Sequence, residues 1–157
     1  MSAPRRGVGR RPREPQTFVV PYSVVTTSGA PILRPMVEVR LHWRGKPQET
    51  LMLFDSGADH SFLPAGMAES LGLDLRGPPR TIRGVGSRFE AREASVYLQI
   101  AEHDTQGRSG IPMPLSPVLV PQDRTVLEDP ILGRAPFLER FEVTLRERDF
   151  VLRQRDV

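Results

Sequence analysis

Residues 51–64 read LMLFDSGADHSFLP, and this stretch constrains the fold more than any other. A run of four apolar residues ends at Phe54 and is typical of a buried strand, after which Asp55-Ser56-Gly57 forms a sharp turn. Asp55 then emerges at the edge of the core, Ser56 can hydrogen-bond to a neighbouring chain, and Gly57 allows the turn without a Cβ clash. The motif occurs once, so a site that needs two such carboxylates must take the second from another copy of the chain.

Alternating apolar residues predict strands on both sides of this turn. Met36 to Trp43 alternates as a half-buried strand, and Gly45-Lys46-Pro47 closes a hairpin into the strand that delivers Asp55. Phe89 to Ile100 alternates in the same way. Shorter strands are expected over residues 17–25, 81–82, 118–120, 141–145 and 150–152. The content of 16 Pro and 13 Gly favours such short strands over long helices.

Only short helices are expected. Pro64 to Leu71 has Pro at its start, apolar residues at four-residue spacing and Gly72 to terminate it. One or two further helical turns are expected over residues 135–140.

Two segments are expected to lie outside regular structure. Pro78 and Pro79 separate the first helix from the short strand at residues 81–82. Residues 101–116 are polar and rich in turn residues, which is typical of a surface loop.

The first 16 residues differ in composition from the rest. They carry five Arg and one Glu, a charge of +4, whereas the other 141 residues carry 17 basic and 18 acidic side chains, a charge of −1. We therefore expect a disordered Arg/Pro-rich tail over residues 1–16 and one folded domain over residues 17–157. A solubilising tail is favoured over an anionic tether for RNA or membrane headgroups, because no aromatic residues are interleaved. The folded part shows no nucleic-acid footprint.

The composition also limits the compartment and the chemistry. The sequence contains no cysteine, so neither a disulfide framework nor a thiolate site is possible. No apolar run exceeds four residues, which excludes a transmembrane helix, and no apolar segment follows Arg10-Arg11 as a signal peptide would require. We expect a cytoplasmic protein. His42, His60 and His103 lack metal-ligand spacing, so no metal site is predicted.

Three motifs occur in the order found in retropepsin-like aspartic proteases, which the sequence resembles. Residues 54–64 (FDSGADHSFLP) are similar to the family's active-site loop, which reads D-[ST]-G-A-[DTS] after an apolar strand. Residues 83–87 (RGVGS) resemble the glycine-rich tip of its flap hairpin, and residues 131–134 (ILGR) its apolar-apolar-Gly-Arg segment. The resemblance covers residues 36–152. It is to a single-motif member of bacterial or retroelement-like type, not to the fused two-lobed type.

The resemblance implies an all-β fold. The chain would form one half of an acid-protease-type closed β-barrel, with a flap hairpin and one or two short helices, completed by homodimerisation. A groove for a peptide or protein substrate would cross the twofold axis. The terminal hairpin over residues 141–153 would contribute to the interface, since an isolated two-stranded edge would otherwise be exposed.

The activity implied by the resemblance is that of an aspartic-type endopeptidase. Two carboxylates close enough to share one proton cannot both ionise, so one acts as base and the other as acid at the same pH. Asp55 and its symmetry mate would form this pair and activate a water placed between them. No cofactor is implied, because two carboxylates and a water suffice.

The resemblance also implies roles for the residues of the loop. Asp55, Ser56 and Gly57 would form the catalytic turn, in which Ser56 supplies a hydrogen bond between subunits. Ala58 and Asp59 would bind the substrate.

Two distant segments would complete the site. Arg134 would pair with Asp59, and Gly133 would allow the backbone to pass close beneath the active loop. The tip Gly84-Val85-Gly86 would form a mobile lid over the bound peptide and so belong to the substrate-binding residues.

Other functions compete with this one. The main alternative is a catalytically weak retropepsin-like module that binds peptides or assembles as a dimer, although the intact Asp55-Ser56-Gly57 argues against it. A weaker alternative is an RNA-associated factor that acts through residues 1–16. A serine nucleophile is disfavoured because G-x-S-x-G is absent, and a dinucleotide site because no G-x-G-x-x-G opens a helix.

Overall fold

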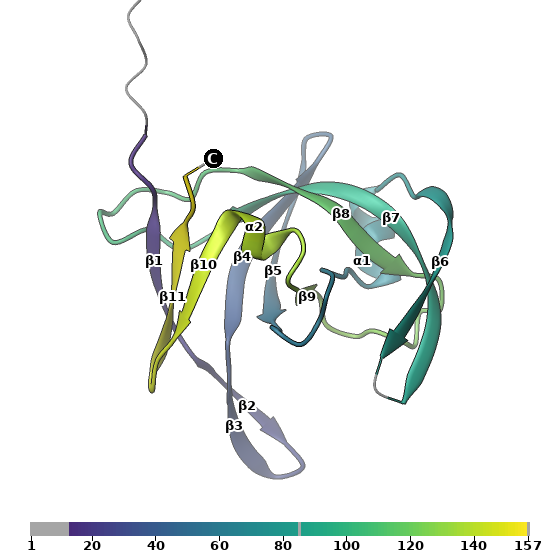
Figure 1. Cartoon of the computed structure of the whole chain (residues 1–157), viewed down its shortest axis with the longest axis horizontal. Coiled ribbons are helices and arrows are strands. Elements are labelled where there is room, and N and C mark those ends of the chain that lie inside the picture. Colours follow the sequence, from purple (N-terminus) through teal and green to yellow (C-terminus); the bar gives the residue numbers. More distant parts are fainter. Residues whose placement is uncertain (1–12, 85, 157) are drawn as a thin grey trace, which may run out of the picture.

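The computed structural model describes residues 13–84 and 86–156. Eleven strands and two short helices lie within them (Figure 1). The strands are β1 (Thr17–Pro21), β2 (Ser23–Thr27), β3 (Ala30–Arg34), β4 (Met36–Trp43), β5 (Lys46–Phe54), β6 (Arg76–Gly84), β7 (Ser87–Ile100), β8 (Met113–Pro121), β9 (Ile131–Leu132), β10 (Phe141–Leu145) and β11 (Asp149–Gln154). The helices are α1 (Ala65–Leu71) and α2 (Phe137–Arg140).

The strands form three sheets. The largest has the order β6-β7-β4-β5-β9, with β8 paired to β7. A second sheet has the order β1-β11-β10, and β2 pairs with β3 in a third. None of these sheets closes into a barrel within the part of the chain that the structure describes. The all-β prediction is therefore confirmed, and the single chain is an open half of the expected barrel.

The strands that lead to Asp55 agree with the prediction. β4 spans Met36–Trp43 and pairs antiparallel with β5 along its whole length. Its inward residues Val37, Val39 and Leu41 are fully buried. The alternation in the sequence therefore located both the strand and its core face.

Two segments differ from the prediction. Pro78 and Pro79 lie within β6 and do not separate it from α1. β6 tolerates them because it is an edge strand and its pairing register shifts between Arg76 and Arg80. The loop expected over residues 101–116 is shorter than predicted, because β8 begins at Met113.

The two helices agree with the prediction within a few residues. α1 ends at Gly72, which adopts the left-handed conformation with φ 67° and caps the helix with its backbone N–H. α1 buries Ala68 and Leu71. Neither helix in the described residues is long and apolar enough to cross a membrane.

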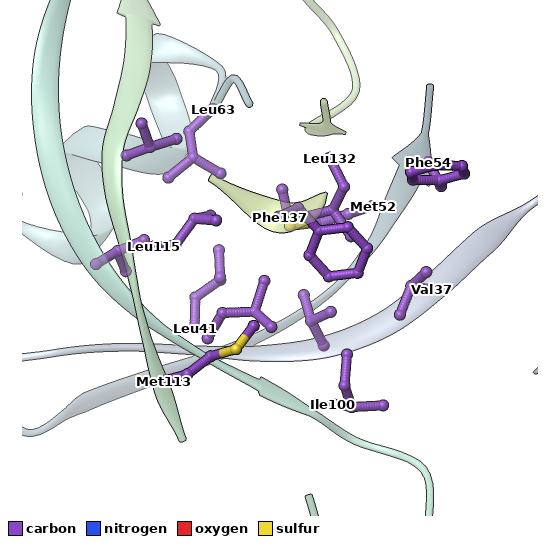
Figure 2. Packing of buried hydrophobic residues seen from close by; sticks show 14 of the residues in the cluster. Val37, Leu41, Met52, Phe54, Leu63, Ile100, Met113, Leu115, Leu132 and Phe137 are labelled. Carbon is purple, nitrogen blue, oxygen red and sulfur yellow. The ribbon is translucent and has the colours of Figure 1, made fainter. Parts of the chain in front are cut away.

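α2 packs against the end of β5. Phe137 is fully buried and belongs to the same core cluster as Met52 and Leu132 (Figure 2). Its ring centroid is 6.0 Å from that of Phe54 and 5.0 Å from that of Phe141. One buried phenylalanine thus joins the residue before Asp55 to the first residue of β10.

The loop between β7 and β8 packs on the start of the folded chain. Gln16 was predicted to end the disordered tail, but it is buried, and its amide donates hydrogen bonds to Asp104 Oδ2 at 3.1 Å and to the carbonyl of Ser109 at 2.9 Å. The folded chain therefore begins before Thr17. Residues 1–12 of the predicted tail lie outside the described residues.

Asp104 is the buried centre of this loop. Burial alone would raise its pKa. The hydrogen bonds that it accepts from Arg108, Gln16 and Gln106 outweigh burial and lower the pKa of Asp104 to about 2.

The terminal hairpin is not the isolated pair of strands that the sequence predicted. β11 pairs with β10 on one side and with β1 on the other, so it lies at the centre of its sheet. β1, which contains Pro21, is an edge strand, where a proline is tolerated. The premise of an isolated two-stranded edge is therefore wrong, and the contribution of residues 141–153 to a dimer interface stays a prediction.

Candidate active site

Asp55 stands where three segments of the chain meet. Its N–H donates to the carbonyl of Leu132 in β9 at 3.0 Å, and the N–H of Phe54 donates to the carbonyl of Pro35 at 2.9 Å. These bonds fix the backbone on both sides of the strand end. The side chain of Asp55 is half-buried and emerges at the edge of the core, where the sequence predicted it.

The turn after Asp55 holds one oxygen of its carboxylate. The N–H of Gly57 donates to Asp55 Oδ1 at 2.8 Å, and the N–H of Ala58 donates to the carbonyl of Asp55 at 3.2 Å. A Cβ on Gly57 would lie 3.2 Å from Oδ1, tighter than an ordinary van der Waals contact. Oδ2 accepts no hydrogen bond from any described residue, so it can bind a proton or a water.

Gly133 passes directly beneath this turn. A Cβ built on Gly133 would lie 1.9 Å from the carbonyl oxygen of His60 and 2.8 Å from that of Ala58. No side chain fits there. The neighbouring N–H groups of Arg134 and Ala135 donate to the carbonyls of Ala58 and Asp59 at 2.8 and 2.9 Å, which joins the two segments by their backbones.

Ser61 completes this support, and it was not among the residues predicted from the sequence. It is fully buried, and its Oγ accepts a hydrogen bond from the N–H of Gly133 at 3.1 Å. Its own N–H donates to the carbonyl of Ala135 at 3.0 Å. Its place within the recognised stretch 54–64, two residues after Asp59, was the one available signal.

Ser56 faces solvent in the single chain. It is exposed, and no described residue of the chain hydrogen-bonds to its hydroxyl. The bond between subunits that the resemblance implies for Ser56 stays a prediction.

Asp59 and Arg134 lie close to each other at the surface. Arg134 Nη1 is 4.0 Å from Asp59 Oδ1, and the two side chains are 63% and 81% exposed. The predicted ion pair is therefore long, and both of its side chains are exposed to water. Such a pair contributes little stability.

A groove of about 650 Å³ lies between the Asp55 turn and the β6–β7 hairpin. Asp55, Gly57 and Ala58 line one side, and Gly84 lines it from the hairpin. The apolar part of the lining consists of Phe62, Ile82, Phe89, Pro121, Val126, Leu127 and Ile131. A groove with a carboxylate on one side and apolar side chains around it suits an extended peptide.

The β6–β7 hairpin reaches over this groove and touches the body beneath it. The ring of Phe89 meets that of Phe62 edge-on, with centroids 6.0 Å apart. Gly86 at the tip has a φ of 74°, which favours glycine. Val85, which was assigned to the same tip, lies outside the described residues.

The remaining polar groups near the groove include one ion pair and no metal cluster. Arg80 lines the groove and bonds to Glu93 at 2.6 Å across the two strands of the hairpin. Within residues 13–84 and 86–156, no three His, Asp or Glu side chains gather as metal ligands would. His60 lines the groove beside Asp59.

Comparison with known proteins identifies a family and similar folds. Residues 37–134, more than half of the chain, match the model of a family described as aspartyl protease. The structure resembles a retropepsin-like aspartic protease from Rickettsia conorii at 17% identity and a TM-score of 0.53, covering 87% of this chain and 98% of that one. The EIAV protease complexed with the inhibitor HBY-793 matches at 25% identity and a TM-score of 0.43, covering 74% of this chain and 93% of that one. No curated protein sequence matches.

Proposed function

The chain belongs to the aspartyl protease family and has the retropepsin-like fold, and from this premise we propose that it is an aspartic endopeptidase that works as a homodimer. Asp55 and the partner subunit's Asp55 share one proton at the twofold axis. We assign this activity to the domain expected over residues 17–157, together with Gln16, which packs against it.

The observation that carries the proposal is the state of the Asp55 carboxylate. Oδ1 is held by the N–H of Gly57, whereas Oδ2 accepts no hydrogen bond from the described residues, and Asp55 lines a groove large enough for a peptide. An oriented carboxylate with one free oxygen is what a general acid or base requires. A turn aspartate with a structural role alone would not need to line a groove.

The reaction follows from two such carboxylates. The ionised member takes a proton from a water between them, and the water oxygen bonds to the carbon of the scissile carbonyl. The protonated member donates its proton to the carbonyl oxygen. The member that took the proton from the water then gives it to the amine nitrogen as the C–N bond breaks. One hydroxyl of the tetrahedral diol gives its proton to the other member as the carbonyl re-forms, so the pair returns to its shared-proton state.

The surrounding residues position the substrate and the turn. Ala58 and Asp59 bind the backbone of the peptide, and the β6–β7 tip with Gly84 and Gly86 covers it. Ser56 donates a hydrogen bond across the dimer. Gly133 and Arg134 keep the turn in place from beneath.

Cleavage of a mixed peptide library at pH about 4 to 7 tests the proposal. Wild type should cleave the peptides, and Asp55→Asn should not. The variant should fold normally, because asparagine keeps an oxygen that accepts the hydrogen bond from the N–H of Gly57. Asp74→Asn is the matched control, because Asp74 is a surface carboxylate that pairs with Arg44 away from the groove.

The two outcomes separate the proposal from its main alternative. Cleavage that is lost only in Asp55→Asn supports hydrolysis by the shared aspartates. Equal background in the three proteins, with a dimer seen by sedimentation, would favour a peptide-binding or assembly module.

A further inference from the structure

The β2–β3 hairpin forms an arm, residues 23–34, that stands apart from the rest of the molecule. β2 and β3 pair only with each other among the described strands. Figure 1 shows the arm extending beyond the lower end of β4, away from the other two sheets. An isolated two-stranded hairpin is marginally stable in water, so an arm of this kind calls for a covering surface.

The arm is apolar where a free hairpin should be polar. Val24 and Leu33 lie directly opposite each other on one face and are 67% and 57% exposed. The opposite face carries the pair Val25 and Ile32. Arg34 is the only charged residue of the arm, so neither strand carries the charges along its length that commonly protect free edges.

Both ends of the arm are fixed to the rest of the molecule through the residues that flank it, Tyr22 and Pro35. At the first end, the hydroxyl of Tyr22 donates to the carbonyl of Arg146 at 2.9 Å, and its ring lies 5.6 Å from that of Phe150. At the second end, the carbonyl of Pro35 accepts the N–H of Phe54, the residue before Asp55. The arm therefore leaves the rest of the molecule between the β1-β11-β10 sheet and the turn that carries Asp55.

This position determines what covers the arm. The proposed function requires a second copy of the chain to bring its own Asp55 against this one, so the partner lies directly against the turn where the arm is rooted. Five residues of strand extend about 17 Å. In Figure 1 the arm points to the same side of the molecule as the turn after β5 and the tip of the β6–β7 hairpin.

We propose that the arm is a dimerisation arm: each copy lays its Val24–Leu33 face on the other copy. The contact is isologous, so two arms act in each dimer. It places the aliphatic pairs out of water and stabilises the assembly that completes the active site. The inference rests on the proposed function only for the position of the twofold axis.

Sedimentation velocity tests the arm directly. The double variant Val24→Asp/Leu33→Asp, made in the Asp55→Asn background to prevent self-cleavage, should raise the dimer dissociation constant at least tenfold, since a buried charge opposes association. Leu75→Asp is the control, because Leu75 is a similarly exposed leucine (44%) remote from the arm. Thermal unfolding of each variant verifies that the fold is kept.

A cross-link identifies the surface that the arm touches. The chain has no cysteine, so Thr26→Cys on the exposed arm face accepts a single benzophenone maleimide. In a mixture of ¹⁴N- and ¹⁵N-labelled protein, illumination should join peptides of opposite label. Ser70→Cys on the exposed side of α1 should give no such product.

Each contrary result has its own meaning. Unchanged dimerisation of the double variant, a monomeric wild type, or cross-links within single copies alone would each overturn the inference. Unchanged dimerisation, with cleavage of protein substrates lost when the double variant is made in the chain that keeps Asp55, would assign the arm to the substrate, which also overturns it. A monomeric wild type would contradict the proposed homodimer as well, whereas failure of the proposed catalysis alone would show in the Asp55→Asn cleavage assay, which sedimentation does not use.

Discussion

The carbonyl oxygen of His60 lies 1.9 Å from the point where a Cβ on Gly133 would stand. Real Cβ atoms do not approach so closely, and the contact is with backbone that other hydrogen bonds hold in place. The turn that carries Asp55 thus rests directly on the main chain of a segment almost 80 residues away. The active loop and the ILGR segment therefore behave as one unit.

Gly133→Ala should destabilise the protein by about 3 kcal/mol or more, because the methyl group must displace backbone. Urea denaturation measures the change. Gly66→Ala is the matched control: Gly66 is in α1, nothing lies within 4 Å of the point where its Cβ would stand, and alanine should raise the free energy of unfolding by up to about 1 kcal/mol. Equal effects of the two substitutions would contradict the role given to Gly133.

Ser61→Ala should lower the free energy of unfolding by about 1–3 kcal/mol, because it leaves the N–H of Gly133 buried without an acceptor. The same denaturation measurement applies. Ser70→Ala removes a hydroxyl that bonds within α1 at the surface, and should change stability by less than about 0.5 kcal/mol. A neutral Ser61→Ala would mean that water replaces the serine hydroxyl.

Asp59→Asn should change stability by less than about 1 kcal/mol, because its pair with Arg134 is exposed and long. The small effect should shrink further as salt is raised. Thermal unfolding at low and high salt checks both points. A loss as large as that for Gly133→Ala would show that the ion pair, and not the backbone contact, holds the turn.

Local patterns in the sequence were sufficient for much of this fold. β4 and α1 were located because their signals lie within the segments themselves: alternation for β4, and Pro64 with Gly72 for α1. The D-S-G turn was read in the same way, since strand, carboxylate and glycine are consecutive.

What the sequence did not reveal depends on contacts between distant residues. Gln16 was assigned to the tail, because its hydrogen-bond partners are distant in the sequence: Asp104 is 88 residues away and Ser109 is 93 residues away. Ser61 was overlooked because its partner, Gly133, is 72 residues away. β3 was not predicted as a strand. It forms by pairing with β2 across the Ser28-Gly29 turn, and it contains Pro31, which is unfavourable in most strands.

Asp104 should make the stability of the protein depend on acid pH. Its pKa is lowered from 3.8 to about 2 in the folded chain, so the unfolded state binds its proton first as the pH falls. The stabilisation by Asp104 is therefore complete above pH about 4 and is lost progressively as the pH approaches 2. Melting temperatures between pH 7 and about 2 should fall steeply in this window.

Asp104→Asn tests the assignment, because asparagine retains an acceptor oxygen but cannot titrate. The variant should be less stable than wild type at pH 7, where it loses the charged bond from Arg108, and the difference should narrow below pH about 4. Asp123→Asn is the comparison: the N–H and hydroxyl of Thr125 lower the pKa of Asp123 too, but at an exposed turn. A constant difference between wild type and Asp104→Asn from pH 7 to 2 would show that Asp104 supports the loop by shape and not by charge. The junction between Gln16 and the loop would then be insensitive to acid.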